Sequence, residues 1–399
     1  MINRPDYIAA IEPFIDKPLV KILAGIRRCG KSTIFEMLRE ELLRRGVGED
    51  QIICKRYTEM DIPENITAKQ MYDELTAAMA GKGHCYLLLD EIQEITGWEK
   101  AVNSLLESTD ADIYVTGSNS KLMSSEISTY LTGRYVSIPV YTLSFKEYLD
   151  FKADSTLSRR ELLEEYIRFG GFPIVALSEY DEQSAYQIVN GIYHTVVSRD
   201  IVKRHRINKQ DLFDRVVKYI IENMGKTFSA NSISTFLKSE HRKVSVESIY
   251  NYLRWLEQAF IIYPCERYDL QGKSILKTQE KYYLADVSLK YALLGYNRKM
   301  LDGAMENIVF LELKRRGYDV FIGKNDTKEI DFVATRRDER IYVQVCVRIP
   351  ETSDREVGNL MEIRDHYPKY VVTLNEMDTG IENGIKIVHL ADFLLADAW

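Results

Sequence analysis

Residues 25–33, GIRRCGKST, combine two glycines, a lysine and hydroxyl side chains in one short stretch. Gly25, Gly30, Lys31 and Ser32 fit the spacing of a glycine, four residues, a second glycine, a lysine and a hydroxyl residue. The glycines let the backbone curl so that its N–H groups meet phosphate oxygens, while Lys31 faces the β- and γ-phosphates and Ser32 offers its hydroxyl to Mg²⁺. The pattern therefore predicts a loop that holds a nucleoside triphosphate, completed by Ile26, Arg27, Arg28, Cys29 and Thr33.

A second group of chemical residues follows an apolar run, in the sequence LLLDEIQ at residues 87–93. Asp90 is predicted to hold Mg²⁺ through water, and Glu91 is placed to orient and deprotonate an attacking water molecule. An apolar strand that ends in Asp-Glu is common by itself. After a phosphate loop it indicates a site for hydrolysis of a nucleoside triphosphate.

These residues need a sheet to position them, and residues 19–140 have the alternation of an α/β domain. Short apolar runs typical of buried parallel strands alternate with amphipathic helices, so we expect a sheet with helices on both faces. The expected strands are 19–24, 51–57, 85–90 and 112–118, and the expected helices are 32–46, 68–81 and 98–108.

The second half of the chain becomes helical and then returns to mixed α/β patterns. Three short helical patterns, at 212–225, 231–239 and 245–262, precede two strand-like runs around a turn at 271–273, which resembles a winged helix. A helix starting at Ser245 could enter a DNA major groove, with Lys238, His241, Arg242 and Lys243 near phosphates. The same helix has an apolar stripe typical of a core, and winged helices also bind proteins, so both partners remain open.

The last hundred residues resemble a restriction-endonuclease-type domain, whose active site takes a helix glutamate, a strand aspartate and a Glu-x-Lys element. Glu306 and Asp331 occupy the first two places, whereas Gln344 and Cys346 stand in the third. A neutral amide binds Mg²⁺ less well than a carboxylate, and a thiol cannot replace the lysine. We therefore expect a nuclease-like fold that has lost cleavage.

Bulk properties limit the remaining function classes. The chain has 399 residues, which favours two or more domains, and its net charge of −7 argues against a surface made wholly for nucleic acid. Five scattered cysteines without metal-ligand spacing indicate free thiols. The sequence shows neither a signal peptide nor a membrane span, so we expect a cytoplasmic protein without a membrane partner.

Taken together, these motifs resemble a widespread group of bacterial and archaeal ATP-binding proteins of the AAA superfamily. The segments that carry the resemblance are GIRRCGKST, LLLDEIQEITGWEKAV, YVTGSNSKLMSSEIS, LTGRY, IPVYTLSFKEYL and GGFP. The resemblance implies ATP with Mg²⁺ as cofactors and Lys31, Ser32, Asp90 and Glu91 in the roles given above. It implies no particular substrate.

The same resemblance places two further residues. Ser118 or Asn119 lies where AAA-type ATPases keep a residue that senses the γ-phosphate, although a helix N-cap before Lys121 explains them equally well. Arg134 could reach a γ-phosphate in its own subunit or in a neighbouring one, or could pair with a surface carboxylate. Action on a neighbour would require a homo-oligomer.

The expected organisation is a P-loop ATPase core of the AAA type at 1–150, a helical lid at 151–207, a winged helix at 208–295 and a nuclease-like α/β domain at 296–399. The expected function is ATP binding and hydrolysis that moves the later domains, either on double-stranded DNA or on a protein. The alternatives are an ATP-gated binding switch with little turnover and, less favoured, an ATP-regulated nuclease.

Overall fold

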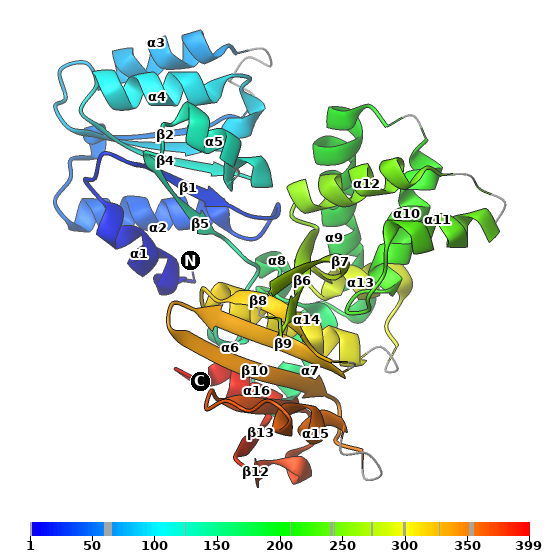
Figure 1. The fold of residues 1–399 in the computed structure, drawn as a ribbon. Helices are drawn as coiled ribbons and strands as arrows, with labels where there is room; N and C mark the ends of the chain where they lie inside the picture. The colour runs from blue at the N-terminus through cyan, green and yellow to red at the C-terminus, as the bar shows by residue number, and fades with distance from the viewer. Residues whose placement is uncertain are drawn as a thin grey trace. The chain divides into compact units, whose positions relative to one another are not determined.

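The computed structural model describes residues 2–59, 66–123, 125–207, 209–239, 242, 244–272, 274–297, 301–326, 328–350 and 355–399. The chain forms two compact units, shown within the ribbon of Figure 1. The first unit comprises Met1–Val140 with Gln258–Phe260, and the second comprises Tyr141–Glu257 with Ile261–Trp399.

The first unit is built on a five-stranded sheet in which each strand pairs with its neighbours in parallel, in the order β2-β3-β4-β1-β5. Its strands are β1 (Val20–Ala24), β2 (Ile52–Arg56), β3 (Cys85–Asp90), β4 (Ala111–Gly117) and β5 (Tyr135–Pro139). The parallel α/β sheet predicted from the sequence is confirmed. The edge strand β5 was not predicted, because its residues are mostly half-buried and lack a continuous apolar run.

Helices cover both faces of this sheet, with α1 and α2 on one side and α3 and α4 on the other (Figure 1). Their bounds are α1 (Pro5–Ile11), α2 (Lys31–Arg44), α3 (Ala68–Met79), α4 (Trp98–Ser108) and α5 (Ser125–Tyr130). Every residue of β1 and β3 is buried. Each large apolar side chain buried in this way stabilises the fold by about 1.5–3 kcal/mol, so the strands provide a rigid base for the residues at their ends.

The second unit begins with helices. Its helices include α6 (Phe145–Phe151), α7 (Arg159–Phe169), α8 (Pro173–Ala176), α9 (Glu182–Thr195), a π-helix (Val196–Lys203), α10 (Gln210–Glu222), α11 (Ala230–Ser239), α12 (Val246–Gln258), α13 (Ser288–Leu294), α14 (Leu301–Arg315), α15 (Arg355–Met361) and α16 (Leu390–Leu395). The three helices predicted between 212 and 262 correspond to α10, α11 and α12.

An eight-stranded mixed sheet completes the second unit, in the order β12-β13-β11-β10-β9-β8-β6-β7. Its strands are β6 (Ile262–Asp269), β7 (Ser274–Leu284), β8 (Asp319–Asn325), β9 (Lys328–Arg336), β10 (Glu339–Cys346), β11 (Lys369–Thr373), β12 (Gly380–Glu382) and β13 (Ile385–His389). The hairpin assigned to a wing is part of this sheet, because β6 pairs in parallel with β8 from Arg267 opposite Ile322 onward. Lys273, at its turn, lies outside the described residues.

The GGFP segment at residues 170–173 has a structural explanation within the second unit. Gly170 has a φ of 71°, and a Cβ there would lie 1.7 Å from Oδ1 of the buried Asp286. The N–H of Gly171 donates to Oδ2 of Asp286 at 2.8 Å. Only glycine fits this approach, so the pair joins the turn after α7 to the segment before α13.

Among the described residues, no helix combines the length and the apolar character needed to cross a membrane.

Candidate functional site

The predicted phosphate loop lies between β1 and α2, at the carboxyl edge of the parallel sheet. Its turn is tight at both ends. A Cβ on Gly25 would lie 2.0 Å from the carbonyl oxygen of Val140, and Gly30 has a φ of 103°. Arg28 also has a positive φ, of 66°, so the loop curls between a strand and a helix N-terminus. Backbone N–H groups and the positive end of a helix are a setting that favours phosphate.

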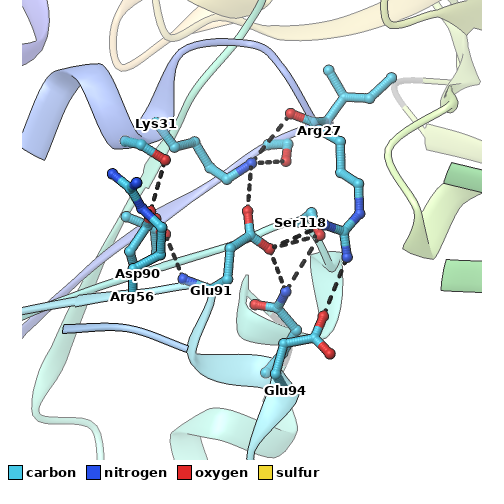
Figure 2. A network of polar contacts seen from close by, with 12 residues as sticks. Arg27, Lys31, Arg56, Asp90, Glu91, Glu94 and Ser118 are labelled. Atoms are coloured by element: carbon cyan, nitrogen blue, oxygen red, sulfur yellow. Dashed lines mark hydrogen bonds and ion pairs between the residues drawn. The ribbon is translucent and has the colours of Figure 1, made fainter. Parts of the chain in front are cut away.

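Lys31 folds back over this loop, as Figure 2 shows. Its Nζ donates to the carbonyl oxygens of Gly25 and Ile26 at 3.0 and 3.2 Å, and lies 3.6 Å from Oε1 of Glu91. The side chain is 3% exposed. The ammonium of Lys31 therefore lies between the loop and the end of β3, where a negatively charged ligand on the loop would compete with Glu91 for it.

Ser32 and Asp90 meet directly, although they come from different elements. The hydroxyl of Ser32 donates to Oδ2 of Asp90 at 2.7 Å, and the hydroxyl of Thr116 on β4 donates to Oδ1. A hydroxyl beside a buried carboxylate at a phosphate loop is a donor set that suits Mg²⁺, which prefers oxygen ligands and retains several waters. The residues present therefore fit a nucleoside triphosphate together with Mg²⁺.

Glu91 is held by several polar groups at once (Figure 2). Oε2 of Glu91 accepts from Nε2 of Gln93 at 2.5 Å and from the hydroxyl of Ser118 at 3.1 Å, and lies 3.8 Å from Nη1 of Arg27. Burial alone would raise the pKa of Glu91, but the charges of Lys31 and Arg27 and the two hydrogen bonds outweigh burial and lower that pKa. The carboxylate is therefore ionised, as a base requires.

The backbone of Glu91 is also unusual, with a φ of 55° and a ψ of 46°. This left-handed conformation is uncommon for a residue other than glycine and is often found at functional sites. The backbone N–H of Glu91 donates to the hydroxyl of Thr116 at 3.0 Å, which fixes the turn after β3.

Support for the loop comes from the N-terminal segment, where no site residue was predicted. Arg4 is 1% exposed, and its Nη1 donates to the carbonyl oxygen of Cys29 at 2.8 Å. Cys29 itself is buried, and burial raises the pKa of its thiol. Cys29 therefore fills space in the loop rather than acting as a nucleophile.

Ser118 and Asn119 have different surroundings. Ser118 faces Glu91, whereas Oδ1 of Asn119 accepts from the backbone N–H of Lys121 at 2.9 Å. Asn119 thus caps the short helix at Ser120–Met123, and Ser118 is the residue that reaches the candidate site.

The structure does not bring Arg134 to this site. Arg134 precedes β5, and its carbonyl accepts from the N–H of Val20, the first residue of β1. The phosphate loop follows the last residue of β1, so Arg134 lies at the opposite edge of the sheet. Its Nη2 donates to Oε1 of Glu107 at 2.6 Å and to Oδ1 of Asn103 at 2.9 Å. Arg134 therefore contacts side chains of α4 and lies away from the phosphate loop of its own subunit.

Two contacts at the site were missed. Gln93 binds Glu91, and Arg56 at the end of β2 donates through Nε to Oδ2 of Asp90 at 3.1 Å. Arg56 and Asp90 are register partners in parallel strands. Because both residues lie at the ends of neighbouring strands, Arg56 could have been predicted to contact Asp90.

A second group of charges, the lysine–carboxylate cluster, lies in the second unit and consists of Lys281, Glu306, Glu329 and Asp331. Nζ of Lys281 on β7 lies 2.9 Å from Oε1 of Glu329 and 3.5 Å from Oε2 of Glu306. Lys281 is 4% exposed. The hydroxyl of Tyr283 donates to Glu306 at 3.1 Å, and the backbone N–H of Val345 donates to Asp331 at 2.8 Å.

Lys281 on β7 thus brings a positive charge to the carboxylates of Glu306 and Glu329. Gln344 accepts from the backbone N–H of Asp331 at 3.3 Å, and burial raises the pKa of the Cys346 thiol to about 12. Within the described part of the chain, no three His, Cys, Asp or Glu side chains are grouped so as to hold a metal ion. The expectation of lost cleavage stays a prediction.

Of the residues proposed to meet DNA phosphates, Lys238 and Arg242 are described, while His241 and Lys243 lie outside the described residues. Arg242 forms an ion pair with Asp211. The outer face of α12 exposes Glu247, Tyr250, Arg254 and Glu257, whose charges sum to −1.

Comparison with known proteins supports the fold assigned to the first unit. Residues 17–149 match an AAA domain, and residues 160–299 match a domain of unknown function. The chain is similar to the Walker-type ATPase PABY2304 of Pyrococcus abyssi, with a TM-score of 0.52 and 16% sequence identity over 73% of this chain and 96% of that one. This likeness supports the P-loop ATPase fold.

Two relatives extend the likeness along the chain. An uncharacterized protein of Methanocaldococcus jannaschii is 32% identical over 355 residues, which cover 85% of this chain and 77% of that protein. An uncharacterized protein of Haemophilus influenzae is 37% identical over 398 residues, which cover 99% of both chains. The chain therefore belongs to the same family as this Haemophilus influenzae protein, and it carries an AAA-type P-loop ATPase domain.

Proposed function

We propose that the protein binds ATP with Mg²⁺ and hydrolyses it at the site formed by the phosphate loop, Asp90 and Glu91. The observation that carries this proposal is the position of Glu91, an ionised carboxylate held beside Lys31 by Ser118, Gln93 and Arg27. A protein that only binds a nucleotide does not need such a base.

Each residue of the site has a separate role in the proposed reaction. The loop from Gly25 to Thr33 receives the phosphates, and Lys31 leaves its contacts with Gly25, Ile26 and Glu91 to meet their charge. Ser32 and Asp90 would hold Mg²⁺, which neutralises charge on the phosphates when bound.

Glu91 has the proton-transfer role. Once Lys31 turns to the phosphates, the carboxylate of Glu91 can orient a water molecule and accept its proton. Ser118 would respond to this movement of Lys31 away from Glu91, because its hydroxyl contacts Glu91 directly. A role for Arg134 would require a second copy of the chain, since it lies at the other edge of its own sheet.

We propose further that hydrolysis moves the winged-helix part, α10–α12 with the β6–β7 hairpin, together with the nuclease-like sheet of the second unit. The outer face of α12, with a formal charge of −1, gives no electrostatic attraction to a phosphate backbone. That observation favours the alternative in which the ATPase gates a protein partner rather than DNA.

The test of the proposed function compares the wild-type chain with Lys31→Ala. We expect wild type to bind a fluorescent ATP analogue in Mg²⁺ and to release phosphate. The variant should bind on the order of 100-fold more weakly, because the loop loses its charged donor. Lys55→Ala, which removes a half-buried lysine paired with Glu74, is the control. Equal binding by wild type and Lys31→Ala would refute the proposal.

A further inference from the structure

Both oxygens of the Asp90 carboxylate are occupied by donors of the protein. Oδ2 accepts from Ser32 at 2.7 Å and from Nε of Arg56 at 3.1 Å, and Oδ1 accepts from Thr116. The side chain of Asp90 is 6% exposed. The donor that carries a full positive charge is Arg56, and it binds the same oxygen of Asp90 as Ser32 does (Figure 2).

Arg56 reaches Asp90 because β2 and β3 are parallel and end together, with Arg56 opposite Asp90. The strand β2 is at the edge of the sheet, so the side chain of Arg56 remains 43% exposed. A cavity of about 310 Å³, lined in part by Ser32, Asp90 and Arg56, opens beside it.

Two other carboxylates lie within reach of the same guanidinium. Nη1 of Arg56 is 3.4 Å from Oε1 of Glu59, and Nη2 is 3.8 Å from Oε1 of Glu36 on α2. Both carboxylates are exposed, and both line the cavity. Arg56 can therefore leave Asp90 and still have a partner for its charge, which lowers the energetic cost of the movement.

We propose that Arg56 gates the metal site: its guanidinium holds Asp90 in the nucleotide-free protein and moves to Glu36 and Glu59 when Asp90 is needed for Mg²⁺. This inference rests on the proposed function. The physical reason is that a guanidinium and a divalent cation repel each other, so both cannot be held at the same side of one carboxylate.

The experiment measures how the binding of a fluorescent ATP analogue to the full chain depends on Mg²⁺ concentration. In Arg56→Ala no competing cation remains on Asp90, so the half-saturating Mg²⁺ concentration should fall by roughly threefold to tenfold. Binding of the analogue in excess chelator should not change. Arg56→Lys, which retains a charge, should lie between the two.

Arg39→Ala is the matched control, because Arg39 lines the same cavity but pairs with Glu49. It should titrate like wild type. An unchanged or higher half-saturating Mg²⁺ concentration in Arg56→Ala would overturn the gating role. If wild type binds the analogue and hydrolyses ATP while the variant titrates like wild type, only this inference fails; if wild type binds no nucleotide, the proposed function fails with it.

Discussion

The phosphate-loop site and the lysine–carboxylate cluster use the same chemistry, a buried lysine among carboxylates, in two different ways. Lys31 contacts two loop carbonyls and one carboxylate, all of which a phosphate could replace. Lys281 is fixed in a strand and lies against Glu306 and Glu329. The first arrangement suits exchange with a ligand, and the second suits permanent neutralisation of buried charge.

The carboxyl groups differ in the same sense. At the phosphate loop, cations and hydrogen bonds outweigh burial and lower the pKa of Glu91. In the lysine–carboxylate cluster, burial raises the pKa of Glu306 and, together with the Glu306 charge, raises that of Asp331 well above its usual value. A chemically similar group of residues thus lowers the pKa of a carboxyl group in one unit and raises it in the other.

The largest expected effect comes from Lys281→Met. Removing one partner of a buried ion pair leaves uncompensated carboxylates, so the free energy of unfolding of the second unit should fall by about 3–5 kcal/mol. Hydrogen exchange of the amides in β7 and β9 measures this directly. Lys328→Met, which breaks an exposed pair with Glu362, should cost less than about 1 kcal/mol. Equal effects of the two variants would contradict the comparison.

A smaller effect is expected from pH. Because the pKa of Asp331 is higher in the folded chain than in the unfolded one, its stabilising contribution is complete below about pH 4 and is lost as pH rises through the folded pKa. Asp331→Asn should therefore reduce the fall in the unfolding free energy as the pH rises above about pH 4.

Urea unfolding of the second unit at several pH values checks this expectation. Asp338→Asn, at an exposed position, should follow wild type throughout. If the unfolding free energy of Asp331→Asn has the same pH dependence as that of wild type, the pKa of Asp331 is not raised. The two sites then do not differ in how they shift the pKa of their carboxyl groups.

The smallest effect is expected from Arg134→Ala. Arg134 and Glu107 form a partly exposed pair, so its loss should change the unfolding free energy by less than about 1 kcal/mol. Phosphate release by dilute monomer should also remain unchanged, since Arg134 lies away from its own phosphate loop. A large loss of turnover where sedimentation shows only monomer would place Arg134 in its own site.

The phosphate-loop site could be predicted because its parts are local. Gly25 to Ser32 follow one strand and open one helix, and Asp90 and Glu91 end another strand of the same parallel sheet. Parallel strands bring their carboxyl ends to one edge, so the contact between Ser32 and Asp90 follows from the order of elements. Arg56 obeys the same rule but belongs to no known motif.

The lysine–carboxylate cluster could not be predicted in the same way. Lys281 joins Glu306 and Glu329 only because the β6–β7 hairpin pairs with β8, a contact between segments far apart in the chain. Nothing in the spacing of residues 274–284 indicates that pairing. Cys346 stands on β10 where the nuclease pattern expects a lysine, whereas Lys281 from β7 contacts the carboxylates of Glu306 and Glu329.

The most direct test of the account is phosphate release from ATP in Mg²⁺ by wild type and by Glu91→Gln, with nucleotide binding measured for both. We predict that binding stays within about twofold while turnover falls by roughly 10²–10⁴-fold, the usual contribution of a positioned base. If wild type binds ATP but releases phosphate no faster than Glu91→Gln, Glu91 is not a base, and the protein is a nucleotide-gated binding switch.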